Sequence, residues 1–134
     1  IEELDYLRGA QKEADFLTGL FNVGVKVIVI TDGKQAVRLY TKDHHQSFMT
    51  PSVEMVDSTG AGDAFSGGWI VGLIEQGIHN PDQLKNACKK ITPLIDAVYL
   101  AMCCGAYAVT QKGAWSALPT RNDIQSLLAS IEKV

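Results

Sequence analysis

The spacing of apolar residues changes from a helical period to a strand-like one within the first part of the chain. Apolar positions recur every three to four residues over Ile1 to Arg8 and Gln11 to Phe21, which predicts two amphipathic helices. A nearly continuous β-branched run, Val25 to Ile30, indicates a strand buried on both faces, as in an α/β sheet. Alternating apolar residues predict two further strands, over Ala36 to Thr41 and Gln46 to Thr50.

Polar turns and helix signals organise the remainder of the chain. Turns are expected at residues 31–34 and 42–45, between the predicted strands. The later elements are all predicted to be helical. The first runs from Ala64 to about Gln76, and the second begins at Pro81 and is interrupted by Pro93. The apolar segment Leu94 to Val109 follows, and a capping box at Thr120 and Asp123 precedes a terminal amphipathic helix. Because the strands lie between two groups of helices, with no linker or repeat, we expect a single α/β unit over residues 1–134.

The composition of the chain argues against several classes of function. The chain has 134 residues, 46% of them hydrophobic and 20% charged, with a formal net charge of −3, which is ordinary for a globular domain. The acidic balance and the lack of a basic stripe argue against nucleic acid or a membrane surface as a partner. No uncharged run reaches the roughly 18 residues of a membrane span, and we find no signal-peptide pattern. Three cysteines without disulfide or metal spacing favour a reducing compartment, and we expect a cytoplasmic protein.

A glycine-containing loop, Asp57 to Asp63, leads directly into a predicted helix. Gly60 and Gly62 free the backbone for unusual dihedral angles and for close approach by a ligand. The unpaired N–H groups at the helix start can then surround an anion such as a phosphate. Asp63 falls in the first turn, where a carboxylate can accept a proton from a hydroxyl while the amides stabilise a transferring phosphoryl group. The residue types alone leave a structural turn and a helix-capping aspartate as alternatives.

Two other phosphate-binding loops do not fit this spacing. A dinucleotide-binding fingerprint requires glycine at position 65, where Phe65 stands. A P-loop requires Gly-Lys-Ser or Gly-Lys-Thr, and neither occurs.

The motif Asp-Ser-Thr-Gly-Ala-Gly-Asp-Ala-Phe, residues 57–65, resembles the C-terminal signature of the ribokinase (PfkB-type) family of carbohydrate kinases. Three further segments resemble the family and occur in the same order along the chain: 17–19, 28–33 and 106–114. Within the family, residues 104–106 and 112–119 are most similar to the fructokinase branch. The likeness spans nearly the whole chain. It implies a ribokinase-like, three-layer αβα fold, represented by its C-terminal nucleotide-binding portion. The sequence enters a helical pattern at Ile1 without an initiator methionine, so we expect the N-terminal half and the lid of that fold to lie outside it.

The resemblance also implies an activity, the ATP-dependent phosphorylation of a sugar hydroxyl. Asp63 would be the general base, and Gly60, Ala61 and Gly62 would form the anion hole for the γ-phosphate. The positions that match nucleotide contacts of the family are Thr31, Gly33, Gly113 and Met102. At the position of Met102, relatives often have a polar residue near the adenine. A monovalent cation, K⁺, would be held by Asp57 and by main-chain oxygens of Thr59, Ala108, Gln111 and Gly113. Glu3 matches a glutamate that tunes Mg²⁺ near the phosphates.

The resemblance favours a hexose such as fructose as the acceptor. A kinase for ribose, a nucleoside or a keto-deoxy sugar acid is the nearest alternative. A non-catalytic nucleotide-binding fragment is the alternative from another class. The expected partners are a small sugar and ATP, and a homodimer of the full-length protein remains open.

Overall fold

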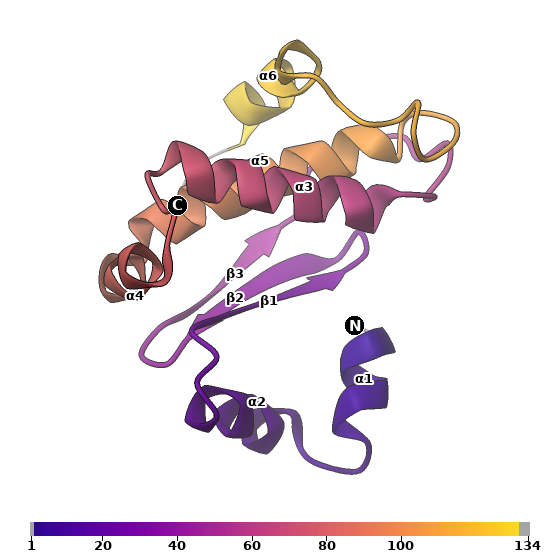
Figure 1. Cartoon of the computed structure of the whole chain (residues 1–134). Helices are drawn as coiled ribbons and strands as arrows, with labels where there is room; N and C mark the ends of the chain where they lie inside the picture. The colour runs from indigo at the N-terminus through magenta and orange to yellow at the C-terminus, as the bar shows by residue number, and fades with distance from the viewer. Residues whose placement is uncertain (1, 132–134) are drawn as a thin grey trace.

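The computed structural model describes residues 2–131 and has three layers around a small sheet (Figure 1). Helices α1 (Glu2–Arg8) and α2 (Glu13–Asn22) cover one face of the sheet, and α3 (Ala61–Glu75) and α5 (Thr92–Ala108) cover the other. Helix α4 (Pro81–Lys90) leads into α5, and α6 (Arg121–Ser130) packs on the outer side of α5. The expected αβα layering is therefore present. The part of the first predicted helix at Ile1 lies outside the described residues.

The sheet contains three antiparallel strands in the order β1 (Val27–Asp32), β2 (Ala36–Thr41) and β3 (His45–Met49). The range of β2 is the one that the alternating pattern predicts. The first strand differs, because it continues through Thr31 and Asp32, which were expected in a turn. The turn begins instead at Gly33, whose φ of +49° suits glycine, and it closes with a 2.9 Å hydrogen bond from the Gln35 N–H to the Asp32 carbonyl. The second connection is also shorter than expected, since β3 already begins at His45.

Both faces of β1 contact helices, although few of its side chains are fully buried. Val27 and Val29 pack against the cluster beneath α3 and α5, whereas Ile28 and Ile30 join Leu4 and other apolar residues of α1 and α2. An ion pair attaches the α1–α2 layer to the sheet, with the Arg38 guanidinium of β2 donating to the Glu13 carboxylate of α2. β1 therefore lies between two helical layers, but it begins at Val27 and only its residue Ile30 is buried, so the prediction of a strand buried on both faces is met in part.

Helix α5 is the central element of the core. Its side chains pack against β2 and β3 on one side and against α3 and α6 on the others. Ten of its residues are buried, which confirms the expectation of a buried apolar helix. No single helix within residues 2–131 is long and apolar enough to cross a membrane, but α4 and α5 together meet that test across a 99° bend.

The bend between α4 and α5 occurs at Ile91 and not at the proline that the sequence suggested. Ile91 has a φ of +54°, the single non-glycine residue with positive φ in the described part of the chain. Pro93 lies in the first turn of α5, where its missing N–H has no helical partner to lose. The helix therefore begins two residues before the predicted Leu94.

Helices α3 and α5 are in near backbone contact. A Cβ built on Gly68 would lie 2.9 Å from the Ala101 Cα, and one on Gly72 would lie 2.7 Å from the Ala97 Cα. Side chains at these two positions would force the helices apart. The small residues therefore set the distance between α3 and α5.

This contact can be tested with two glycines of the same helix. We expect Gly72→Ala to destabilise the fold by about 1–3 kcal/mol, because overpacking against backbone outweighs the gain in helix propensity. Gly67 is exposed and has no atom within 4 Å of a built Cβ, so Gly67→Ala should stabilise by about 0.5–1 kcal/mol. Urea unfolding of both variants measures the difference, and equal effects of the same sign would contradict the close contact.

Candidate active site

The loop before α3 is held in place by the carboxylate of Asp57. Its Oδ1 accepts a hydrogen bond from the Thr59 N–H at 2.9 Å, and its Oδ2 accepts one from the Gly113 N–H at 2.9 Å. The backbone of the loop is fixed as well, since the Val56 and Asp57 N–H groups both donate to the Val109 carbonyl, at 2.7 and 3.1 Å. The loop that precedes α3 is thus tied to the loop that follows α5.

These hydrogen bonds favour the ionised form of Asp57. The N–H of Gly113 has the largest effect, followed by the hydroxyl and N–H of Thr59, and together they lower the pKa of Asp57 from its ordinary 3.8 to about 2. The side chain is therefore a carboxylate at neutral pH.

The start of α3 has backbone N–H groups at exposed positions. Helix α3 begins at Ala61, three residues earlier than predicted, so Asp63 lies in its first turn as expected. The Ala61 N–H donates to the Ser58 carbonyl at 3.2 Å, whereas the N–H groups of Gly62 and Asp63 have no acceptor among the described residues. The Gly60 N–H has no acceptor among the described residues either. The amide groups free to bind an anion are thus those of Gly60, Gly62 and Asp63, so the Ala61 N–H of the predicted trio is occupied.

Gly60 makes the turn into α3 possible. Its φ is +79°, and a Cβ built on it would lie 3.0 Å from both the Cα and Cβ of Ala114. A side chain at Gly60 would be strained and would push the two loops apart. Ala114 was not among the predicted site residues, and the one signal available in the sequence was its small size directly after Gly113.

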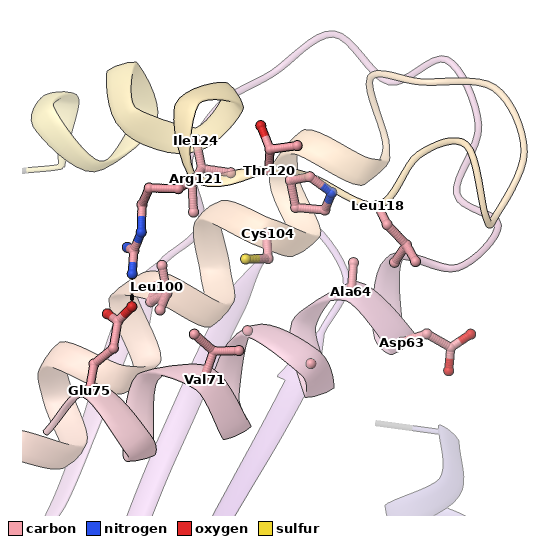
Figure 2. A pocket seen from close by; sticks show the side chains of 13 residues that line it. Asp63, Ala64, Val71, Glu75, Leu100, Cys104, Leu118, Thr120, Arg121 and Ile124 are labelled. Atoms are coloured by element: carbon pink, nitrogen blue, oxygen red, sulfur yellow. Dashed lines mark hydrogen bonds and ion pairs between the residues drawn. The ribbon is translucent and has the colours of Figure 1, made fainter. Parts of the chain in front are cut away.

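Asp63 is exposed at the end of a pocket of about 380 Å³ between α3, α5 and α6. Figure 2 shows its carboxylate pointing outward, away from α5 and α6. The other end of the pocket is bounded by an ion pair between Glu75 and Arg121, which the sequence analysis did not foresee. The carboxylate of Asp63 is therefore accessible to a hydroxyl group that approaches from the solvent.

The predicted nucleotide contacts on the first strand lie at the same end of the fold. Thr31 pairs with Val37 near the carboxyl end of β1, and Gly33 begins the turn that follows. Figure 1 places this end of β1 beside the start of α3 in the view. Both residues are exposed, as a contact with a ligand requires.

The segment after α5 contains the remaining predicted ligands. It forms a hydrogen-bonded turn in which the Gln111 N–H donates to the Ala108 carbonyl at 3.1 Å. Gly113 follows with a φ of +84° and binds Asp57 through its N–H. The structure thus brings Asp57, Thr59 and Gly113 together directly and places Ala108 and Gln111 in the adjoining turn.

Two predicted site residues lie elsewhere. Met102 is 2% exposed and belongs to the core cluster with Val37, Leu39 and Phe48, so its side chain faces the sheet and is not a surface contact for a nucleotide. Glu3 is an exposed residue of α1, which covers the face of the sheet opposite α3 and α5 (Figure 1). No cluster of three or more His, Cys, Asp or Glu side chains able to hold a metal ion occurs within residues 2–131.

The Asp57 hydrogen bonds predict a specific dependence of stability on acid. A carboxylate whose pKa is lowered on folding stabilises the fold above its ordinary pKa of 3.8, and this contribution disappears as the pH falls through about 2. We therefore expect the difference in unfolding free energy between the native chain and Asp57→Asn to shrink over this interval. Urea unfolding at several pH values measures it, and a ¹³C titration of the Asp57 carboxyl centred near 3.8 would disprove the assigned hydrogen bonds.

Comparison with known proteins identifies the family to which the chain belongs. Residues 1–121 match the model of the pfkB family carbohydrate kinases. The chain is 37% identical over 133 residues to the probable fructokinase-5 of Arabidopsis thaliana, covering 98% of this chain and 39% of that protein.

Solved structures give the same result for the fold. A fructokinase with bound ATP from Xylella fastidiosa superposes with a TM-score of 0.89 at 30% identity, over 96% of this chain and 40% of that one. A double-mutant fructokinase from Vibrio cholerae O395, bound to fructose, ADP and a potassium ion, superposes with a TM-score of 0.76 at 32% identity, over 95% and 38%. The chain thus spans about two fifths of the length of its relatives. It has a ribokinase-like fold and belongs to the pfkB family of carbohydrate kinases.

Proposed function

We propose that this chain carries the nucleotide-binding and phosphoryl-transfer residues of a fructokinase-like sugar kinase. The observation that carries the proposal is the start of α3, where three N–H groups without acceptors among the described residues lie beside the outward-pointing carboxylate of Asp63. Similarity to fructokinases over nearly the whole chain supports the sugar class. A hexose such as fructose is the proposed acceptor.

In this proposal Asp63 is the general base. Its carboxylate accepts the proton of the sugar hydroxyl as that oxygen forms a bond to the γ-phosphorus and the bond to the β-phosphate oxygen breaks. Its exposed position allows a hydroxyl to reach it from the open side. Positioning supplies much of the rate of phosphoryl transfer, so the orientation of the acceptor hydroxyl matters as much as the base itself.

The amides at the start of α3 stabilise the charge on the transferred group. We assign the anion hole to residues 60–63: Gly60 permits the turn, and the N–H groups of Gly60, Gly62 and Asp63 donate. The positive end of the α3 dipole adds to their effect. Thr31, Gly33 and Gly113 are the proposed contacts for the rest of the nucleotide.

The loop chemistry also fits a monovalent cation and Mg²⁺. Carbonyl and carboxylate oxygens are the donors that hard cations prefer, and Asp57 and its neighbours supply both kinds. K⁺ would be held by Asp57 and main-chain oxygens of Thr59, Ala108, Gln111 and Gly113, and its charge would order the loop around the anion hole. Mg²⁺ is commonly bound through substrate phosphates with few protein ligands, which suits a role for Glu3 in tuning it.

Replacing the proposed base separates catalysis from binding. We expect Asp63→Asn to lower fructose-dependent ADP release by about 10²–10⁴-fold while ATP binding, measured by calorimetry, stays the same. Asp82→Asn is the matched control, because Asp82 is also an exposed acidic residue in the first turn of a helix, α4.

The outcome discriminates among the alternatives. Turnover with ribose, a nucleoside or a keto-deoxy sugar acid in place of fructose would change the assigned substrate. ATP binding without turnover on any of these acceptors would favour a non-catalytic nucleotide-binding fragment. Undiminished turnover in Asp63→Asn would show that the base is misassigned.

The cation proposal predicts that ATP binds more tightly in KCl than in tetramethylammonium chloride at equal ionic strength. Asp57→Asn should abolish this difference, since it removes the anionic ligand. Asp123→Asn is the control: this carboxylate is also hydrogen-bonded with a lowered pKa, but it lies in the capping box of α6. A K⁺ response that survives in Asp57→Asn would remove Asp57 from the site.

A further inference from the structure

Trp115 has the most exposed large apolar side chain in the described part of the chain, at 88%. The other tryptophan, Trp69, is partly buried and packs against the core cluster beneath α3 and α5. Tryptophan is highly buried on average in folded proteins, because its ring has a large apolar surface. The indole ring of Trp115 has little contact with its own chain and is therefore available to a ligand.

The loop that contains Trp115 is fixed on both sides of that residue. Before it, the Gly113 N–H donates to the Asp57 carboxylate at 2.9 Å. After it, Ala117 is fully buried in the cluster shared by α5 and α6, and the Leu118 N–H donates to the Trp115 carbonyl at 3.3 Å. The backbone at Trp115 is thus held in place, although its ring is open to solvent.

The ring is also adjacent to the proposed anion hole. The preceding residue, Ala114, has its Cα and Cβ 3.0 Å from a Cβ built on Gly60, so the two loops are in close contact at this point. The N–H groups of Gly60, Gly62 and Asp63 have no acceptors among the described residues. Free N–H donors and an uncovered aromatic ring therefore lie on neighbouring segments, the loop before α3 and the loop after α5 (Figure 1).

These two features together fit a ligand that has an anionic part and a flat apolar part. A nucleoside triphosphate has both, since its phosphates accept hydrogen bonds from N–H groups and its base has an aromatic face on which an indole ring can stack. A free phosphate or a sugar lacks the aromatic face. Gly113, two residues before Trp115, is one of the proposed nucleotide contacts, so the ring lies on the same loop as that contact.

We propose that the indole of Trp115 stacks on the nucleobase of the phosphoryl donor and thereby determines which donors bind well. This assignment rests on the kinase function proposed above. Every base has an aromatic face, so stacking does not distinguish adenine from guanine. The larger purine rings overlap an indole more than pyrimidine rings do, so Trp115 favours ATP and GTP over CTP and UTP.

Calorimetry with the 134-residue chain tests the stacking, with ATP, GTP, CTP and inorganic tripolyphosphate as the probes. We expect Trp115→Ala to weaken the binding of ATP and GTP by about 5- to 100-fold, the range of base stacking on an aromatic ring, and to leave tripolyphosphate binding within about 2-fold. Trp115→Phe should keep most of the ATP affinity, because an aromatic ring remains. Tyr6→Ala is the control, at an 87% exposed position of α1 on the other face of the sheet, and should change neither affinity.

The fluorescence of Trp115 reports on the same contact. The chain has two tryptophans, so the emission that is lost in Trp115→Phe belongs to the exposed ring. Stacking on the base should change this emission when ATP is added and leave it unchanged when tripolyphosphate or fructose is added. Circular dichroism checks that both variants keep the fold, as an exposed position predicts.

The other results overturn the assignment. Equal ATP affinity in the native chain and in Trp115→Ala would remove Trp115 from the nucleotide site. Equal losses of ATP and tripolyphosphate affinity would show that the side chain acts through the loop and not by stacking. A change in emission with fructose and not with ATP would place the sugar on the ring.

Failure of the kinase function gives a different result. ATP binding that depends on Trp115, without phosphorylation of any sugar, would reject the kinase function and leave the stacking in place. Sugar phosphorylation with unchanged ATP affinity in Trp115→Ala would reject the stacking alone. Absence of ATP binding by the native chain would reject both.

Discussion

The contact between α3 and α5 determines where the candidate site forms. Because Gly68 and Gly72 leave no room for side chains, α3 lies almost backbone to backbone on α5, and α5 in turn fills the face of the sheet. The first turn of α3 is thereby fixed relative to the loop that follows α5. The hydrogen bond from Gly113 to Asp57 can then form across 56 positions of sequence. The position of Asp63 is thus a consequence of helix packing as much as of its own motif.

The two aspartates of one loop have different surroundings and suit different work. Asp57 accepts two backbone hydrogen bonds, one on each carboxylate oxygen, and so holds the two loops together. Asp63 is exposed and points away from the helices, so its carboxylate is available to a ligand. A base that must accept a proton needs free lone pairs, whereas a carboxylate that orders a loop needs occupied ones. In the proposed mechanism, these two roles fall to residues at either end of one seven-residue segment, 57–63.

The sequence predicted those features that depend on local patterns. The range of β2, the capping box before α6 and the place of Asp63 in a first helical turn all follow from short-range spacing. Features that depend on rotation or long-range contact were not predictable. Helix α5 is apolar on every side, so nothing in its pattern shows that Met102 faces the sheet and not the surface. The bend at Ile91 likewise reflects packing, because the adjacent Pro93 was the stronger local signal.

The mismatches that remain all concern exposed surface. α3 and β1 both have the composition of interior elements, yet Ile70, Val71 and Ile74 of α3 are exposed, and β1 has β2 as its one strand neighbour within the described residues. The carboxylate of Asp63 is also open to water, although a general base for phosphoryl transfer works best where water is excluded. A general base at Asp63, as proposed above, therefore requires that water be excluded from this side of the molecule when a sugar binds.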